Sequence, residues 1–115
     1  MRAEDRIRLR HMLDAAAEAV SSAAGKTRVD LDRDRVWSLG LVKCVEIVGE
    51  AAARVGIETR QGIPQIPLVQ IVAMRNRLVH AYFDIDLDQV WLAVTEDLPP
   101  LIEALKEALR VTDAG

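Results

Sequence analysis

The apolar segment between residues 33 and 55 constrains the fold more than any other part of the chain. If this segment is helical, apolar side chains lie on almost every side of it, namely Val36, Trp37, Leu39, Leu41, Val42, Cys44, Val45, Ile47, Val48, Ala51, Ala52 and Val55. A helix that is apolar nearly all round is buried on more than one side. We therefore expect a central helix, with one side facing the domain core and the other suited to a dimer interface.

Two glycines and two glutamates interrupt this apolar helix. Gly40 and Gly49 each reduce helix propensity by roughly 1 kcal/mol relative to alanine, and this cost predicts that another helix approaches closely at both positions. Glu46 and Glu50 lie one turn apart. Two interpretations of them stay open: carboxylates at the rim in water, or carboxylates that reach a buried partner.

Three further segments carry apolar residues at helical spacing. They run over residues 3–24, from Pro67 to about residues 80–82, and from Asp86 towards the C-terminus. The pattern predicts one all-α domain over residues 1–115. Its architecture is an antiparallel bundle of four to five helices, because the last helix can be split in two.

The segments between these helices carry loop and capping signals. Residues 26–34 and 57–66 are polar or interrupted by glycine and proline, and we expect loops there. Asp86 and Gln89 have the spacing of a capping box, which predicts that a helix begins at Asp86. Pro99 predicts a kink or a break, because proline removes one helical hydrogen bond and clashes with the preceding turn.

The composition limits the class of protein. Aromatic residues make up 3% of the chain, so the core is aliphatic, which favours packed helices over a sheet. The net charge of −3 is unlike that of a protein that coats nucleic acid, so any RNA contact requires a local basic patch. The only cysteine, Cys44, is expected to be a buried thiol. The N-terminus lacks a signal core and no apolar run approaches the ~18 residues of a membrane span, so we expect a soluble cytoplasmic protein.

Residues 74–84 concentrate the polar side chains with chemical potential, which are Arg75, Asn76, Arg77, His80 and Tyr82. Histidine titrates near neutral pH and transfers protons, and arginine offers a planar donor fork for phosphate. These groups suit metal-independent RNA cleavage, in which a base deprotonates the ribose 2′-hydroxyl and arginine stabilises charge on the phosphate. No metal-ligand spacing is present in the sequence, and we expect no metal and no cofactor.

The spacing within this stretch leaves the geometry open. Arg75 and His80 are five positions apart, which is about 140° around an ideal helix. Either the helix ends near His80 and frees its side chain to turn, or two copies of the helix meet about a two-fold axis. A purely structural interpretation also exists, in which Arg75, Arg77 and His80 complement the negative end of the helix and Tyr82 packs on Leu78.

Residues Arg75, His80 and Tyr82 match the R-x4-H-x-Y signature of the HepT-type HEPN-domain toxins. Flanking segments also resemble this family: residues 47–52, 66–76, 83–91 and 96–99. The resemblance covers roughly residues 5–109. One departure is Leu68, where many relatives carry tryptophan, and this position affects packing and not the motif.

The resemblance implies a HEPN bundle that forms a homodimer, with the motif helices facing each other across a cleft. It implies a type VII toxin–antitoxin system, in which the toxin is a metal-independent endoribonuclease with RNA as substrate. Arg75 and His80 would be the catalytic pair, supported by Asn76 and Arg77. The implied antitoxin is a minimal nucleotidyltransferase that transfers AMP from ATP to Tyr82, adding a negative charge that repels an RNA phosphate.

One alternative to the ribonuclease stays open. The chain could be a non-catalytic helical binding subunit of a minimal nucleotidyltransferase complex, with the motif used for nucleotide or protein contact. The acidic net charge favours this alternative, whereas the dense Arg/Asn/Arg/His group favours catalysis.

Overall fold

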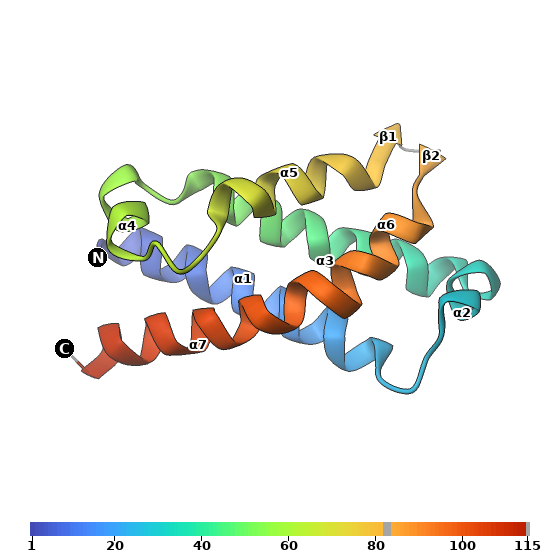
Figure 1. Cartoon of the computed structure of the whole chain (residues 1–115), viewed down its shortest axis with the longest axis horizontal. Helices are drawn as coiled ribbons and strands as arrows, with labels where there is room; N and C mark the ends of the chain where they lie inside the picture. Colours follow the sequence, from blue (N-terminus) through green and yellow to red (C-terminus); the bar gives the residue numbers. More distant parts are fainter. Residues whose placement is uncertain (82–83, 115) are drawn as a thin grey trace.

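The computed structural model describes the backbone of residues 1–81 and 84–114 and the side chains of residues 1–78 and 84–110. Four helices form the body of the protein: α1 (Ala3–Ala23), α3 (Arg35–Arg54), α5 (Leu68–Leu78) and α7 (Leu98–Ala114). They run antiparallel along the long axis of a molecule of 46 × 28 × 18 Å, with α1 against α3 and α7, and α3 against α5 (Figure 1). This arrangement confirms the predicted all-α bundle.

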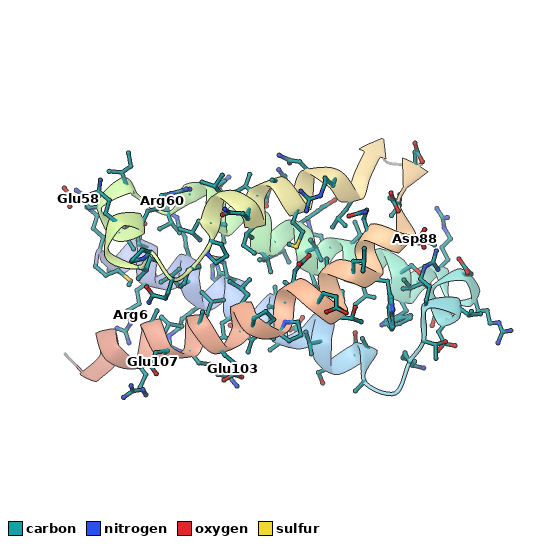
Figure 2. All side chains as sticks on the ribbon, viewed as in Figure 1. Arg6, Glu58, Arg60, Asp88, Glu103 and Glu107 are labelled. Atoms are coloured by element: carbon teal, nitrogen blue, oxygen red, sulfur yellow. The ribbon has the colours of Figure 1, made fainter. Side chains whose placement is uncertain are left out.

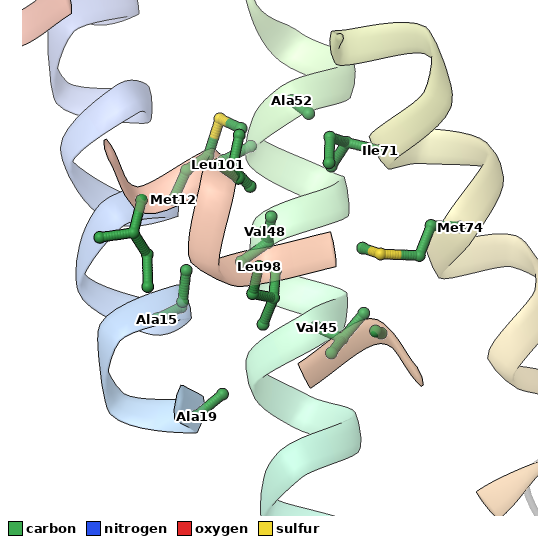
Figure 3. Packing of buried hydrophobic residues seen from close by; sticks show 14 of the residues in the cluster. Met12, Ala15, Ala19, Val45, Val48, Ala52, Ile71, Met74, Leu98 and Leu101 are labelled. Atoms are coloured by element: carbon green, nitrogen blue, oxygen red, sulfur yellow. The ribbon is translucent and has the colours of Figure 1, made fainter. Parts of the chain in front are cut away.

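The core of the bundle is aliphatic, as the shortage of aromatic residues predicts. Figure 3 shows side chains of α1, α3, α5 and α7 meeting in it, including Met12, Ala15, Ala19, Val45, Val48, Ala52, Ile71, Met74, Leu98 and Leu101. The central helix α3 is buried along most of its length, but Val36 is 82% exposed and Leu39 is 40% exposed near its N-terminus. One side of α3 therefore faces the core, and apolar side chains near its start face outward.

Two short helices occupy the segments for which loops were expected, so those two expectations were wrong. They are α2 (Arg28–Arg33) and α4 (Ile57–Gly62). The start of α2 is fixed locally, because the Thr27 amide donates to the Asp30 carboxylate at 2.7 Å. Six residues are too few to display a helical period, so their polar composition resembles that of a loop.

A buried carboxylate joins α1 to the corner between α3 and α4. Asp5 is 2% exposed and accepts hydrogen bonds from the Thr59 hydroxyl at 2.6 Å, the Gly56 amide at 3.1 Å and the Arg8 guanidinium at 3.1 Å. The bond from Thr59, helped by those from Gly56 and Arg8, lowers the pKa of Asp5 although burial opposes this shift. The corner is thus fixed by an ionised carboxylate, two of whose partners, Gly56 and Thr59, lie far away in sequence.

The segment that follows Asp86 begins, and is interrupted, close to where the sequence predicted. Asp86 precedes α6 (Leu87–Leu92), and its carboxylate accepts the Gln89 amide at 3.1 Å, which confirms the predicted cap. Between α6 and α7 the chain forms a π-helical turn, η1 (Ala93–Asp97). The expected interruption before Pro99 therefore takes the form of a wide turn, a common way for a helix to accommodate a defect in its hydrogen bonding.

Two smaller predictions concern surface and solvation. Cys44 is half-buried and not fully buried, and burial, with a smaller effect of Glu18, raises the pKa of its thiol. Among the described residues, no helix combines the length and the apolar character that crossing a membrane requires.

Candidate active site

Helix α5 presents three of the five predicted polar residues, Arg75, Asn76 and Arg77, in its last turn. Its buried face consists of Leu68, Ile71, Met74 and Leu78, which fixes how the helix is rotated on the core. Arg75 is consequently half-buried, whereas Asn76 and Arg77 are exposed. The three residues therefore form a polar surface at the C-terminal end of α5.

Arg75 lies directly on the backbone of α3. A Cβ atom built on Gly49 would be 2.6 Å from both Cβ and Cγ of Arg75 and 3.1 Å from its Cδ. This contact confirms the close helix approach predicted at Gly49. The same prediction is wrong at Gly40, where no described atom lies within 4 Å of such a Cβ. The contact at Gly49 places Arg75 where α3 and α5 touch.

The guanidinium of Arg75 is held at its outer end by Asn76. Arg75 Nη1 donates to the Asn76 side-chain oxygen at 3.2 Å. A guanidinium carries five N–H donors, and this is the one side-chain hydrogen bond of Arg75 recorded among the described residues. Within the part of the chain whose side chains are described, the other donors are left for an anion that approaches the end of α5, and phosphate matches their geometry.

The helix ends before His80. Helix α5 stops at Leu78, and the chain continues as strand β1 (Val79–Ala81), which pairs antiparallel with β2 (Asp84–Ile85). The Asp86 amide donates to the Leu78 carbonyl at 2.8 Å and closes the base of this short ladder. The sequence did not predict these strands, but it offered a helix end near His80 as one of two arrangements, and the backbone has that form.

The remaining motif groups lie outside the described residues. The His80 backbone lies in β1, but its side chain is not described, and Tyr82 is not described at all. The pairing of Arg75 with His80 therefore stays a prediction. Of the two carboxylates on α3, Glu50 is exposed, as the rim interpretation predicts, and Glu46 is half-buried.

The described residues contain no group of three or more His, Cys, Asp and Glu side chains placed to hold a metal ion. His11, the second histidine, is exposed on α1, as a surface residue would be.

The opposite end of the molecule has a cavity that sequence reasoning missed. It has a volume of about 1380 Å³ and lies between the start of α1, helix α4 and α7. Figure 2 shows Glu58 and Glu107 at this end and Asp88 at the other, near the strands. Acidic residues outnumber basic ones in its lining, which disfavours an RNA phosphate there. Asp5, Gly56 and Thr59 line this cavity and are joined by hydrogen bonds. These contacts are long-range, so a single sequence does not predict the cavity.

Comparison with known proteins decides the family. The family model described as "Ribonuclease HepT-like" matches residues 12–108. The chain belongs to the HepT-like ribonuclease family. This match confirms the resemblance drawn from the motif and its flanks, and it contains the whole stretch from Arg75 to Tyr82.

Individual HepT-like relatives agree with this assignment. A protein of Thermococcus cleftensis named as a probable ribonuclease HepT is 32% identical over 93 residues, covering 77% of this chain and 84% of its own. A protein of Caldanaerobacter subterraneus named as a candidate RNase is 28% identical over 102 residues, covering 89% of this chain and 91% of its own. No solved structure gives a significant match to the chain.

Proposed function

We propose that this HepT-like protein is the ribonuclease toxin of a type VII toxin–antitoxin pair and cleaves RNA without a metal ion. The observation that carries the proposal is the family match over residues 12–108, which includes the R-x4-H-x-Y motif. Supporting it, Arg75 is anchored at the end of α5 with guanidinium donors left for a phosphate.

The proposed reaction uses Arg75 and His80 as the catalytic pair. The His80 imidazole takes the proton of the ribose 2′-hydroxyl, and the 2′-oxygen attacks the adjacent phosphorus. The bond from phosphorus to the 5′-oxygen breaks, and that oxygen takes up a proton from solvent water. Arg75 binds the phosphate oxygens as their negative charge grows, and Asn76 and Arg77 support its position and the local positive potential. The products are a 2′,3′-cyclic phosphate and a 5′-hydroxyl.

We further propose that the protein acts as a homodimer, with two motif segments facing a shared cleft. The apolar side chains that a single chain leaves exposed support this, among them Val36 at 82% exposure on α3 and Val69 at 70% on α5. Burying such side chains against a second copy removes apolar surface from water, which drives association.

The proposed regulation acts on Tyr82. A minimal nucleotidyltransferase antitoxin transfers AMP from ATP: the tyrosine oxygen bonds to the α-phosphorus and pyrophosphate leaves. The new phosphodiester adds bulk and negative charge two residues from His80 and repels the RNA phosphate.

The test is to incubate the purified protein, with Tyr82 verified as unmodified by intact mass, with total cellular RNA in excess EDTA. We expect fragments that end in 2′,3′-cyclic phosphate. If all RNA stays intact, the ribonuclease proposal fails. Tight binding of the nucleotidyltransferase in that case would favour the non-catalytic binding subunit, which the acidic net charge also favours.

A further inference from the structure

Helix α3 contains two glycines in very different surroundings. At Gly49 the stem of Arg75 fills the space that a side chain would occupy, with Cβ and Cγ each 2.6 Å from an added Cβ. At Gly40 no described atom lies within 4 Å. Gly49 is also buried, whereas Gly40 is exposed. The same residue type therefore serves a close contact in one place and faces open space in the other.

We propose that Gly49 is a positioning residue for Arg75, because its bare backbone is the surface on which the arginine stem rests. This inference rests on the proposed function, in which Arg75 binds the RNA phosphate. The stem is held between α3 and α5, and the guanidinium is bonded to Asn76 at 3.2 Å. Both ends of a long, flexible side chain are thus restrained before substrate arrives.

Restraint of this kind matters for catalysis by arginine. A mobile arginine loses side-chain entropy when it binds phosphate, whereas one already ordered by packing does not. Catalysis also depends on the position of the charge, since a displacement of about 1 Å at a catalytic group costs on the order of 100-fold in rate. Gly49 would therefore contribute to the turnover number without touching RNA.

A methyl group at position 49 has no easy way to be accommodated. Its contact is with Arg75 Cβ, and that atom is fixed by the backbone of α5, not by a flexible tip. Rotation of the arginine stem moves Cγ and Cδ but not Cβ, so α5 has to move away from α3 at this point. That movement displaces the guanidinium that α5 carries.

The experiment compares Gly49→Ala with Gly40→Ala, the same substitution on the same helix. Two readouts are measured in each variant: cleavage of an RNA substrate, as kcat and KM, and the 15N relaxation order parameter of Arg75 Nε in the protein without RNA. For Gly49→Ala we expect a fall in kcat on the order of 100-fold, a smaller change in KM and a lower order parameter. For Gly40→Ala we expect wild-type values in all three.

Three outcomes separate the inference from the proposed function. A wild-type order parameter and a wild-type kcat in Gly49→Ala overturn the inference. If the wild-type protein cleaves no RNA, the proposed function falls, and the order parameter alone then decides whether Gly49 holds Arg75. If Gly49→Ala does not fold, the double variant Gly49→Ala/Arg75→Gly removes the clashing stem: recovery of folding supports the contact, and failure to recover overturns it.

Discussion

Replacing Asp5 by alanine should destabilise the fold more than its position in the first turn of a terminal helix would indicate. The carboxylate is 2% exposed and accepts three hydrogen bonds, of which the one from Thr59 at 2.6 Å is buried. Truncation removes these bonds and leaves the Thr59 hydroxyl and the Gly56 amide without this acceptor. A hydrogen bond to a charged group contributes about 1.5–3 kcal/mol, and an unsatisfied buried donor costs about 1–3 kcal/mol. Because these two contributions overlap, we expect Asp5→Ala to lower the free energy of unfolding by about 3 kcal/mol.

The assay is urea denaturation followed by far-UV circular dichroism at fixed protein concentration and neutral pH. Asp14→Ala, which removes an exposed carboxylate from the same helix, is the matched control and should change stability by less than about 0.5 kcal/mol. A double-mutant cycle with Thr59→Ala should give a coupling of at least about 1 kcal/mol. A loss below about 1 kcal/mol for Asp5→Ala, or no coupling to Thr59, would refute the reasoning.

The same carboxylate makes stability depend on pH. The pKa of Asp5 is lower in the folded protein than the ordinary value of 3.8 for an aspartate, chiefly because of the bond from Thr59. A group with a depressed folded pKa contributes stability above its unfolded pKa, and the contribution is lost as pH falls through the folded pKa. The stability difference between wild type and Asp5→Ala should therefore be constant near neutrality and shrink below pH of about 4.

Three further predictions concern other parts of the protein. Val36 is an apolar residue that is 82% exposed. Val36→Asp should convert the dimer to a monomer in sedimentation velocity while the circular dichroism spectrum stays unchanged. A dimer that persists in this variant would show that the face around Val36 is not the dimer interface. Asp86→Ala removes the acceptor of the Gln89 amide and should lower the free energy of unfolding, measured by urea denaturation, by about 1 kcal/mol. An unchanged free energy of unfolding would show that the cap is dispensable. Tyr82→Phe should still cleave RNA but gain no AMP mass with the nucleotidyltransferase and ATP; a mass gain would place the modification elsewhere.

The long helices were predictable from sequence because each displays several helical periods. The cap at Asp86 and the close approach at Gly49 were predictable too, since both depend on local chemistry and spacing. Helices α2 and α4 were missed because six residues do not establish a period. The error at Gly40 has a different origin: its propensity cost is real, but no helix contact compensates for it within the described residues.

The sequence proposed the residues of the candidate site, whose roles stay a prediction, but it did not show how the chain builds the surface around them. The motif named Arg75 and its polar neighbour Asn76. The separation of about 140° between Arg75 and His80 on an ideal helix left two arrangements open, and the backbone has the form of one of them, a helix that ends before His80. Strands β1 and β2 could not be read from segments of two or three residues. The Asp5 network was equally hidden, because its partners Gly56 and Thr59 lie 51 and 54 residues away.

The most direct test of the central claim is single-turnover RNA cleavage in EDTA by Arg75→Ala and His80→Ala. Arg110→Ala is the control, since this exposed arginine on α7 pairs with Glu107 and matches the charge change of Arg75→Ala. We expect both motif variants to remain folded and to lose at least about 100-fold in rate, with Arg110→Ala at the wild-type rate. Wild-type rates in both motif variants would contradict the account.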